Sequence, residues 1–160
     1  MSKKLVAYFS ASGSTSRLAQ TLAAAAGADV YAIRPAVPYE RKDLNWMDKK
    51  ARSTVEMADP SFRVEMADTA APVADADVIF LGFPIWWYRE PSIIDSFLDA
   101  YDLSGKTIVP FFTSGGSPLG EGQGRIEQLA RGAKVLTAKR FSARASEQEL
   151  RDWIAGLRLV

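Results

Sequence analysis

The sequence predicts an α/β fold in which a doubly wound, five-stranded parallel sheet lies between two layers of helices, a three-layer α/β/α sandwich. Short apolar runs alternate with segments of helical periodicity, and this βαβαβ order favours a parallel sheet covered by helices on both faces. The chain has 160 residues, enough to bury a full hydrophobic core in one domain. Because no repeat, low-complexity tract or linker divides it, we expect a single domain over residues 1–160.

Five apolar runs have the length and composition of buried strands. Pro110 lies inside the fourth run, where its missing backbone N–H makes it unusual for a central strand. The expected strands are residues 5–9, 29–33, 78–82, 107–112 and 133–141.

Four segments combine helical periodicity with start or stop signals. Gly27 and Gly132 are placed to end two of them, and Pro91 suits the first turn of a third. Ser146 with Glu149 forms a capping-box pattern ahead of the last. The expected helices are residues 15–26, 91–101, 122–131 and 146–157.

Residues 34–77 form the least regular part of the sequence. We expect a helix within Asp43–Met57, although the charged stretch around it has no clean period. The sequence assigns no role to this segment.

The composition excludes several classes of function. The chain has 20 basic and 19 acidic residues, so no basic excess argues for nucleic acid, and no basic amphipathic helix argues for a membrane surface. It has neither cysteine nor histidine, which removes thiolate nucleophiles, the commonest general base and most zinc sites. We expect no metal site, and no catalytic side chain stands out. Without a membrane span or a signal peptide, we expect a cytoplasmic protein.

The first expected strand leads through the loop SASGST, residues 10–15, into a helix. In an open parallel sheet, ligands bind outside the carboxyl ends of the strands, where the N–H groups of the first helical turn face the crevice. Hydroxyls add further donors and Gly13 permits close approach of the backbone. These groups can hold a phosphate without a lysine, although the same residues also suit a simple helix cap. The GK[ST] ending of a P-loop and the G-x-G-x-x-G motif are both absent.

The third expected strand ends in a loop rich in aromatic side chains. Large rings are costly to expose unless they stack on something, and a flat isoalloxazine ring has a suitable size. The alternative is that some of these side chains pack into the core or a subunit interface. The side chains expected at a ring are Pro84, Ile85, Trp86, Trp87 and Tyr88.

The fourth expected strand ends in TSGGSPLG, residues 113–120, a loop of hydroxyls and glycines without charge. Its backbone amides can approach the polar edge of a planar ligand. In a sheet of order 2-1-3-4-5, strands one, three and four are adjacent, so all three loops would share one edge. Three ligand-type loops at one edge are a stronger indication of a binding site than any one of them.

With SASGST, GFPIWW and TSGGS in this order, the chain resembles the flavodoxin family over nearly its whole length, and it looks most like the short-chain, small bacterial flavodoxin-like proteins. The resemblance implies a flavodoxin-like fold and noncovalent FMN. It implies that the phosphate sits on Ser10, Ser12, Gly13, Ser14 and Thr15. It also implies that the ring lies among Pro84, Ile85, Trp86, Trp87 and Tyr88 and meets Thr113, Ser114, Gly115 and Gly116.

Three functions fit this resemblance. The first is an FMN-dependent oxidoreductase that passes electrons from a nicotinamide nucleotide to a small acceptor such as a quinone, with the flavin carrying the electrons. The second is a one-electron carrier that docks onto a redox partner protein, which the balanced charge of this chain disfavours because carriers of the family are strongly acidic. The third is a flavin-free module of the same fold that binds a phosphate ligand. The sequence does not decide between a monomer and a homodimer.

Charge near the expected ring separates the first two functions further. The ring loops contain only Glu90 as an acid, opposed by Arg89. Weak negative charge around the ring destabilises a fully reduced flavin anion less than strong negative charge does, and this favours two-electron transfer. Arg89 is expected either to meet an anionic donor or acceptor or to be a solvated surface residue.

Overall fold

Six parallel strands form one sheet in the computed structural model, which describes residues 3–114 and 116–159. The strand order is β2-β1-β3-β4-β5, with β6 also paired to β4, which confirms the predicted doubly wound order 2-1-3-4-5. The strands are β1 (Lys4–Tyr8), β2 (Asp29–Ala32), β3 (Val78–Pro84), β4 (Thr107–Thr113), β5 (Lys134–Val135) and β6 (Lys139–Phe141).

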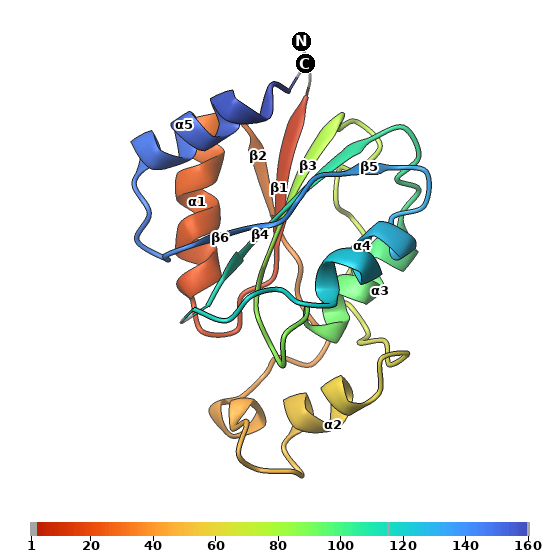
Figure 1. The fold of residues 1–160 in the computed structure, drawn as a ribbon. Coiled ribbons are helices and arrows are strands. Elements are labelled where there is room, and N and C mark those ends of the chain that lie inside the picture. The colour runs from red at the N-terminus through yellow and green to blue at the C-terminus, as the bar shows by residue number, and fades with distance from the viewer. Residues whose placement is uncertain (1–2, 115, 160) are drawn as a thin grey trace.

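Helices cover both faces of the sheet, as Figure 1 shows. α1 and α5 lie together on one face, and α3 and α4 lie together on the other. Their ranges are α1 (Ser14–Ala26), α3 (Ser92–Ala100), α4 (Gly122–Leu129) and α5 (Glu147–Leu157). The predicted signals at Gly27, which ends α1, and at Ser146, which caps α5, are confirmed, whereas α4 ends at Leu129 instead of the predicted Arg131. In the part of the chain that the structure describes, no helix is long and apolar enough to cross a membrane.

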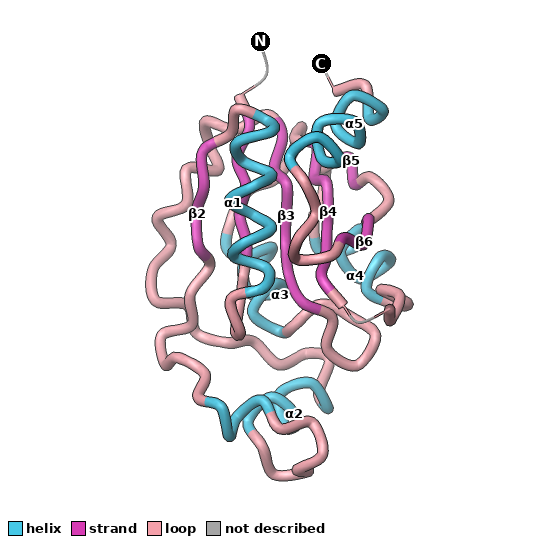
Figure 2. The backbone as a smooth tube through the Cα atoms, turned by 90° about the vertical axis from the view of Figure 1, so that its left-hand side faces the viewer, coloured by secondary structure: helices cyan, strands magenta, loops and turns pink. Residues whose placement is uncertain are grey.

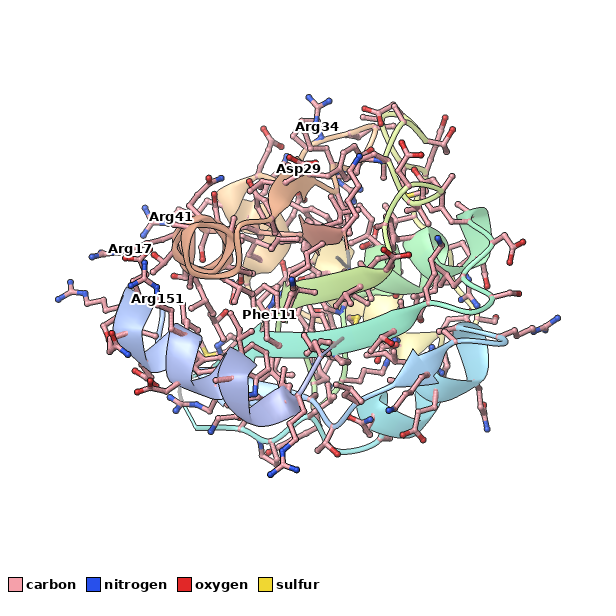
Figure 3. The ribbon with its side chains drawn as sticks, turned by 90° about the horizontal axis from the view of Figure 1, so that it is seen from above. Arg17, Asp29, Arg34, Arg41, Phe111 and Arg151 are labelled. Carbon is pink, nitrogen blue, oxygen red and sulfur yellow. The ribbon has the colours of Figure 1, made fainter. Side chains whose placement is uncertain are left out.

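The strands are apolar on both sides because helices cover both faces. In β1, Leu5 and Ala7 belong to the core cluster that includes residues of α3 and α4, whereas Val6 and Tyr8 belong to the cluster that includes residues of α1 and α5. This alternation is the period of a strand. Figure 3, a view from above, shows Phe111 of β4, which is fully buried, inside the molecule. The arginines labelled in the same view extend from the surface.

The predicted fifth strand, residues 133–141, is two short strands, and Pro110 lies opposite the break. β5 pairs with the first two residues of β4 and β6 with its last three. The carbonyl groups of Lys106 and Ile108 accept hydrogen bonds from N–H groups of the β5 segment. Because backbone groups alternate in direction along a strand, the nitrogen of Pro110 faces that same side. A proline nitrogen cannot donate there, which explains why the pairing is interrupted at this point.

Between β2 and β3 the chain extends beyond the carboxyl edge of the sheet. This segment, which we call the excursion (residues 37–63), contains the 3-10 helix η1 (Arg41–Leu44) and α2 (Arg52–Ala58). Figures 1 and 2 both draw α2 beyond the end of the sheet instead of against its face. The helix predicted within Asp43–Met57 is therefore confirmed only for its second part, α2, because the chain between η1 and α2 is not helical.

Local side-chain hydrogen bonds explain the interruption of that helix. The Asn45 side chain accepts from the N–H of Met47 at 3.1 Å, and the Asp48 side chain accepts from the N–H of Lys50 at 2.9 Å. Bonds of this kind offer the backbone an alternative to helical pairing. The result is a loop between η1 and α2, and this loop carries Trp46 and Met47.

Candidate functional site

The loop between β1 and α1 presents an open helix N-terminus at the carboxyl edge of the sheet. Gly13 precedes α1 with φ +96°, a left-handed conformation that suits glycine. Its N–H donates to Ser10 Oγ at 3.0 Å. α1 has no side-chain cap from the described part of the chain and no acidic residue in its first turn. The positive end of the helix dipole therefore remains available to an anion.

The hydroxyls of this loop divide into two groups. Ser12 and Ser14 are exposed beside the open turn. Thr15 is 1% exposed, and its Oγ1 lies 2.9 Å from Thr113 Oγ1 at the end of β4. The hydroxyl of Thr15 therefore joins the first loop to the third, in addition to any role toward a phosphate.

The aromatic loop after β3 closes in a tight two-residue turn. Trp86 and Arg89 exchange two backbone hydrogen bonds, with N···O distances of 3.1 and 3.2 Å. Trp87 and Tyr88, between them, have φ +49° and +62°. This is the type I′ pattern, which Asn-Gly usually fills, so two bulky residues here are strained by about 1–3 kcal/mol each. Strain of this kind is concentrated at functional sites.

The turn sets which aromatic side chains are accessible. Trp87 is 40% exposed and Tyr88 is 61% exposed. Trp86 packs edge-to-face against Phe9 and Tyr39, with ring centroids 5.6 and 5.4 Å apart. Side chains of neighbouring extended residues point in opposite directions, but this rule does not apply to Trp87, because the backbone there is left-handed instead of extended.

The loop after β4 is held by its own polar groups. Ser114 Oγ donates to the carbonyl of Ser117 at 2.8 Å and accepts from the N–H of Gly116 at 3.3 Å. Arg140 of β6 donates to the Ser114 carbonyl at 2.8 Å. Gly115, also expected at the ring, lies outside the described residues. The two adjoining loops meet at Thr113, whose carbonyl accepts from the N–H of Ile85 at 3.1 Å.

A cavity of about 530 Å³ lies against the aromatic loop. This volume is within the usual range for small-molecule sites, ~300–1,000 Å³. Among the described residues, its lining contains four of those expected at a ring, but neither Pro84 nor Thr113, Ser114, Gly116 or the expected residues of the first loop. It is lined by Ile85, Trp86, Trp87, Tyr88, Ser117, Leu44, Trp46 and Ser53.

Sequence reasoning missed the three residues that the excursion contributes to this cavity, Leu44, Trp46 and Ser53. The available signal was a tryptophan within the charged stretch NWMDKK, where no apolar period explains it by packing. Trp46 is 70% exposed.

Arg89 is buried, which contradicts both predicted roles for it. Its Nη2 donates to the carbonyl of Met57 at 3.0 Å, and its Nη1 lies 3.6 Å from Asp95 Oδ2. Arg125 bridges Glu90 and Asp95 at 3.0 and 2.5 Å. The four side chains form a buried charge cluster, and Glu90 does not belong to the cavity lining.

Burial, together with the neighbouring Asp95 carboxyl, raises the pKa of Glu90 to about 8. Glu90 Oε1 and Asp95 Oδ1 are buried and accept no hydrogen bond from the described residues, and a proton on Glu90 supplies one donor to the pair. Within residues 3–114 and 116–159, no group of three or more acidic side chains is arranged to hold a metal ion.

Comparison with known families and structures gives consistent results. The family model described as flavodoxin matches residues 3–157. The structure is similar to a candidate flavoprotein from Bacteroides eggerthii DSM 20697, with 41% sequence identity, a TM-score of 0.92 and coverage of 100% of both chains. A candidate flavoprotein from Bacteroides uniformis ATCC 8492 has 38% identity and a TM-score of 0.90, with 96% of this chain and 98% of that chain covered.

A more distant similarity concerns a structure that contains the cofactor. It is a flavoprotein from Lactobacillus acidophilus NCFM in complex with FMN, with 18% identity, a TM-score of 0.70, and coverage of 96% of this chain and 99% of that chain. At this identity the likeness shows the fold alone. Among the curated proteins, none matches the sequence.

Proposed function

Because the chain belongs to the flavodoxin family, we propose that it binds FMN noncovalently at the carboxyl edge of its sheet and passes electrons from a nicotinamide nucleotide to a small acceptor such as a quinone. Bound FMN supplies the electron-transfer chemistry, which the side chains of a protein without cysteine or histidine are poorly equipped to perform. The protein contributes binding, orientation and the electrostatic environment.

The observation that carries the proposal is the position of Thr113. Its hydroxyl bonds to Thr15 in the first turn of α1, and its carbonyl bonds to Ile85 at the start of the aromatic loop. An uncapped helix end and an aromatic-lined cavity therefore flank one residue. A ligand with a phosphate at one end and a flat ring at the other matches this arrangement.

The first loop fits the phosphate of FMN. Ser12 and Ser14 offer exposed hydroxyls, and the uncapped first turn of α1 offers backbone N–H groups. A side chain built on Gly13 would meet no atom within 4 Å, so the space over this residue is open to a ligand. Ser10 supports the loop by accepting from the N–H of Gly13. The glycine-rich loop after β4 is assigned to the ring, so no further turn of this kind remains for an adenylate, which supports FMN over FAD.

The aromatic loop fits the ring. Two backbone hydrogen bonds close the turn that carries Trp87 and Tyr88, so its backbone is preorganised for a ligand. Ile85 and Trp86 complete the same wall of the cavity. We propose that this wall, with the backbone of residues 113–116, holds the isoalloxazine.

An enzyme fits the charge distribution better than a protein-docking carrier. The formal net charge is +1, and the two charges predicted beside the ring, Arg89 and Glu90, are both buried in the ion-pair cluster. Electrostatic steering of a partner protein usually requires a surface patch of one sign. A small acceptor needs only access to the cavity.

Reconstitution and reduction test this function. The apoprotein is incubated with FMN and FAD together, and the retained flavin is released and identified by chromatography. The flavin band at ~450 nm is then followed as NADH or NADPH is added without oxygen, and again after a quinone is added. Retention of FMN with nucleotide-dependent bleaching and quinone-dependent recovery is the expected result. Retention of FAD alone, or no bleaching by either nucleotide, would contradict the proposal.

A further inference from the structure

The excursion is anchored to the body of the protein at both ends. On the entering side, the Tyr39 ring packs against Phe9 and Trp86, and the Arg52 guanidinium lies 3.9 Å from the centre of the Tyr39 ring. Glu56 of α2 accepts from both Arg52 and the Tyr39 hydroxyl. These contacts tie α2 to the residues beneath the aromatic loop.

On the leaving side, two arginines of the buried cluster hold the backbone of the excursion. Arg89 donates to the carbonyl of Met57 at 3.0 Å, and Arg125 donates to the carbonyl of Pro60 at 2.9 Å. Hydrogen bonds from charged donors are stronger than neutral ones. Both ends of the excursion are therefore tied to the protein beside the aromatic loop.

Exposed apolar side chains concentrate on this anchored segment and on the aromatic loop. Of the eight large hydrophobic side chains that are exposed among the described residues, five belong to the excursion and two to the aromatic loop: Val37, Trp46, Met47, Val55, Phe62, Trp87 and Tyr88. Exposed apolar side chains that gather on one part of the surface indicate a binding site. Trp46, which also lines the cavity, is the largest of those on the excursion.

We propose that Trp46 forms the outer wall of a second ligand subsite, in which a neutral, planar aromatic molecule of the quinone class lies between Trp46 and the flavin ring that the aromatic loop is proposed to hold. This inference rests on the proposed function, because the facing wall is the one proposed to hold the flavin ring. It assigns a role to the excursion and identifies Trp46 as the residue that determines acceptor affinity.

The chemistry of the lining selects the ligand class. Among the described residues, none of the side chains that line the cavity is charged, and its polar groups are the hydroxyls of Ser53, Ser117 and Tyr88 and the indole N–H groups of the three tryptophans. The Ser53 hydroxyl already donates to the carbonyl of Asp43, so the donors that remain for a ligand oxygen are the hydroxyls of Ser117 and Tyr88 and the indole N–H groups. An anionic ligand would lose its hydration here without a charged partner, whereas a neutral aromatic ring can stack on Trp46.

The test measures binding of 1,4-naphthoquinone to the FMN-loaded protein by equilibrium titration, with sulfonated naphthoquinone as an anionic probe. The absence of cysteine removes thiol adducts as a source of signal. Wild type is expected to bind the neutral probe at least about tenfold more tightly than the anionic one. Trp46→Ala is expected to weaken binding of the neutral probe by about tenfold, the equivalent of ~1.4 kcal/mol. Trp46→Phe is expected to weaken it by less than about threefold, since a smaller ring still stacks.

Met47→Ala is the matched control, because Met47 is adjacent and equally exposed but does not line the cavity. It is expected to change naphthoquinone affinity by less than about twofold. FMN affinity, measured separately, is expected to stay within about threefold of wild type in every variant.

The outcomes separate this inference from the proposed function. Unchanged naphthoquinone affinity in Trp46→Ala, in a protein that retains FMN, overturns the subsite alone. An equal loss of FMN and naphthoquinone affinity in that variant also overturns it, because Trp46 would then belong to the flavin site. Tighter binding of the sulfonated probe overturns the ligand class. Failure of wild type to bind FMN overturns both proposals.

Discussion

Thr15 Oγ1 and Thr113 Oγ1 lie 2.9 Å apart where the first turn of α1 meets the end of β4. Both residues are buried, at 1% and 8% exposure, and they are 98 positions apart in the sequence. This hydrogen bond holds two loops of the candidate site in register. It also changes the expectation for Thr15, whose hydroxyl supports the site from inside the protein.

Replacing either threonine with valine keeps the side-chain shape and leaves one buried hydroxyl without its partner. We expect Thr15→Val and Thr113→Val each to lower the free energy of unfolding by about 1–3 kcal/mol. The double variant is expected to lose less than the sum of the two, because removing both hydroxyls leaves neither unpaired. Urea denaturation of the four proteins measures this coupling. Strict additivity would mean that the hydrogen bond contributes nothing.

Ser12 is expected to act on the phosphate directly. Ser12→Ala should weaken FMN binding by roughly tenfold, because a hydrogen bond to a charged group contributes about 1.5–3 kcal/mol. Riboflavin, which lacks the phosphate, should bind this variant and wild type alike. Titration of apoprotein by flavin fluorescence quenching measures both affinities. Equal losses for FMN and riboflavin would show that Ser12 acts through loop structure instead.

The left-handed turn at Trp87 and Tyr88 is expected to cost stability. Tyr88→Gly removes the strain of φ +62°, whereas Tyr88→Ala removes the same exposed ring and retains the strain. We expect the glycine variant to be more stable than the alanine variant by about 1 kcal/mol. Thermal or urea unfolding of the pair gives this difference. A more stable alanine variant would mean that the backbone at residue 88 is not left-handed in solution.

Glu90 is expected to make stability depend on pH. Its pKa is raised from 4.5 in the unfolded chain to about 8 by burial and by Asp95. Between these values the folded state holds a proton that the unfolded state lacks, so the contribution of Glu90 to stability falls as pH rises from about 5 to about 8. Arg89 and Arg125 face the same carboxyl and oppose the shift.

Glu90→Gln isolates this effect, because glutamine is neutral at every pH and keeps a similar shape. The stability of the variant relative to wild type should rise steadily across that pH range. Urea denaturation at several pH values measures the difference. A constant difference would show that Glu90 is ionised in the folded protein throughout.

Much of the fold could be predicted because the strands are apolar on both faces and the helices carry local end signals. Gly27 and Ser146 mark helix ends through contacts within a few residues, which sequence spacing records. The position of the break between β5 and β6 could not be predicted, because it depends on which side of β4 the nitrogen of Pro110 faces. That direction follows from the register of neighbouring strands.

The candidate site was predictable only in part. The three loops follow strand ends and were found from residue type, but Trp46 reaches the cavity through the path of an irregular segment that has no periodic pattern. The burial of Arg89 depends on Asp95 and on Arg125, 36 positions further along the chain. Such distant ion-pair partners leave no local signal in the sequence.

We propose that the uncapped end of α1 binds the phosphate of FMN, and a comparison of two flavins tests this binding. The apoprotein is titrated with FMN and with riboflavin under the same conditions, and the two Kd values are compared. Two phosphate hydrogen bonds of about 1.5 kcal/mol each predict that FMN binds roughly a hundredfold more tightly. Equal affinity for the two flavins, or failure of FMN to bind, would contradict the account.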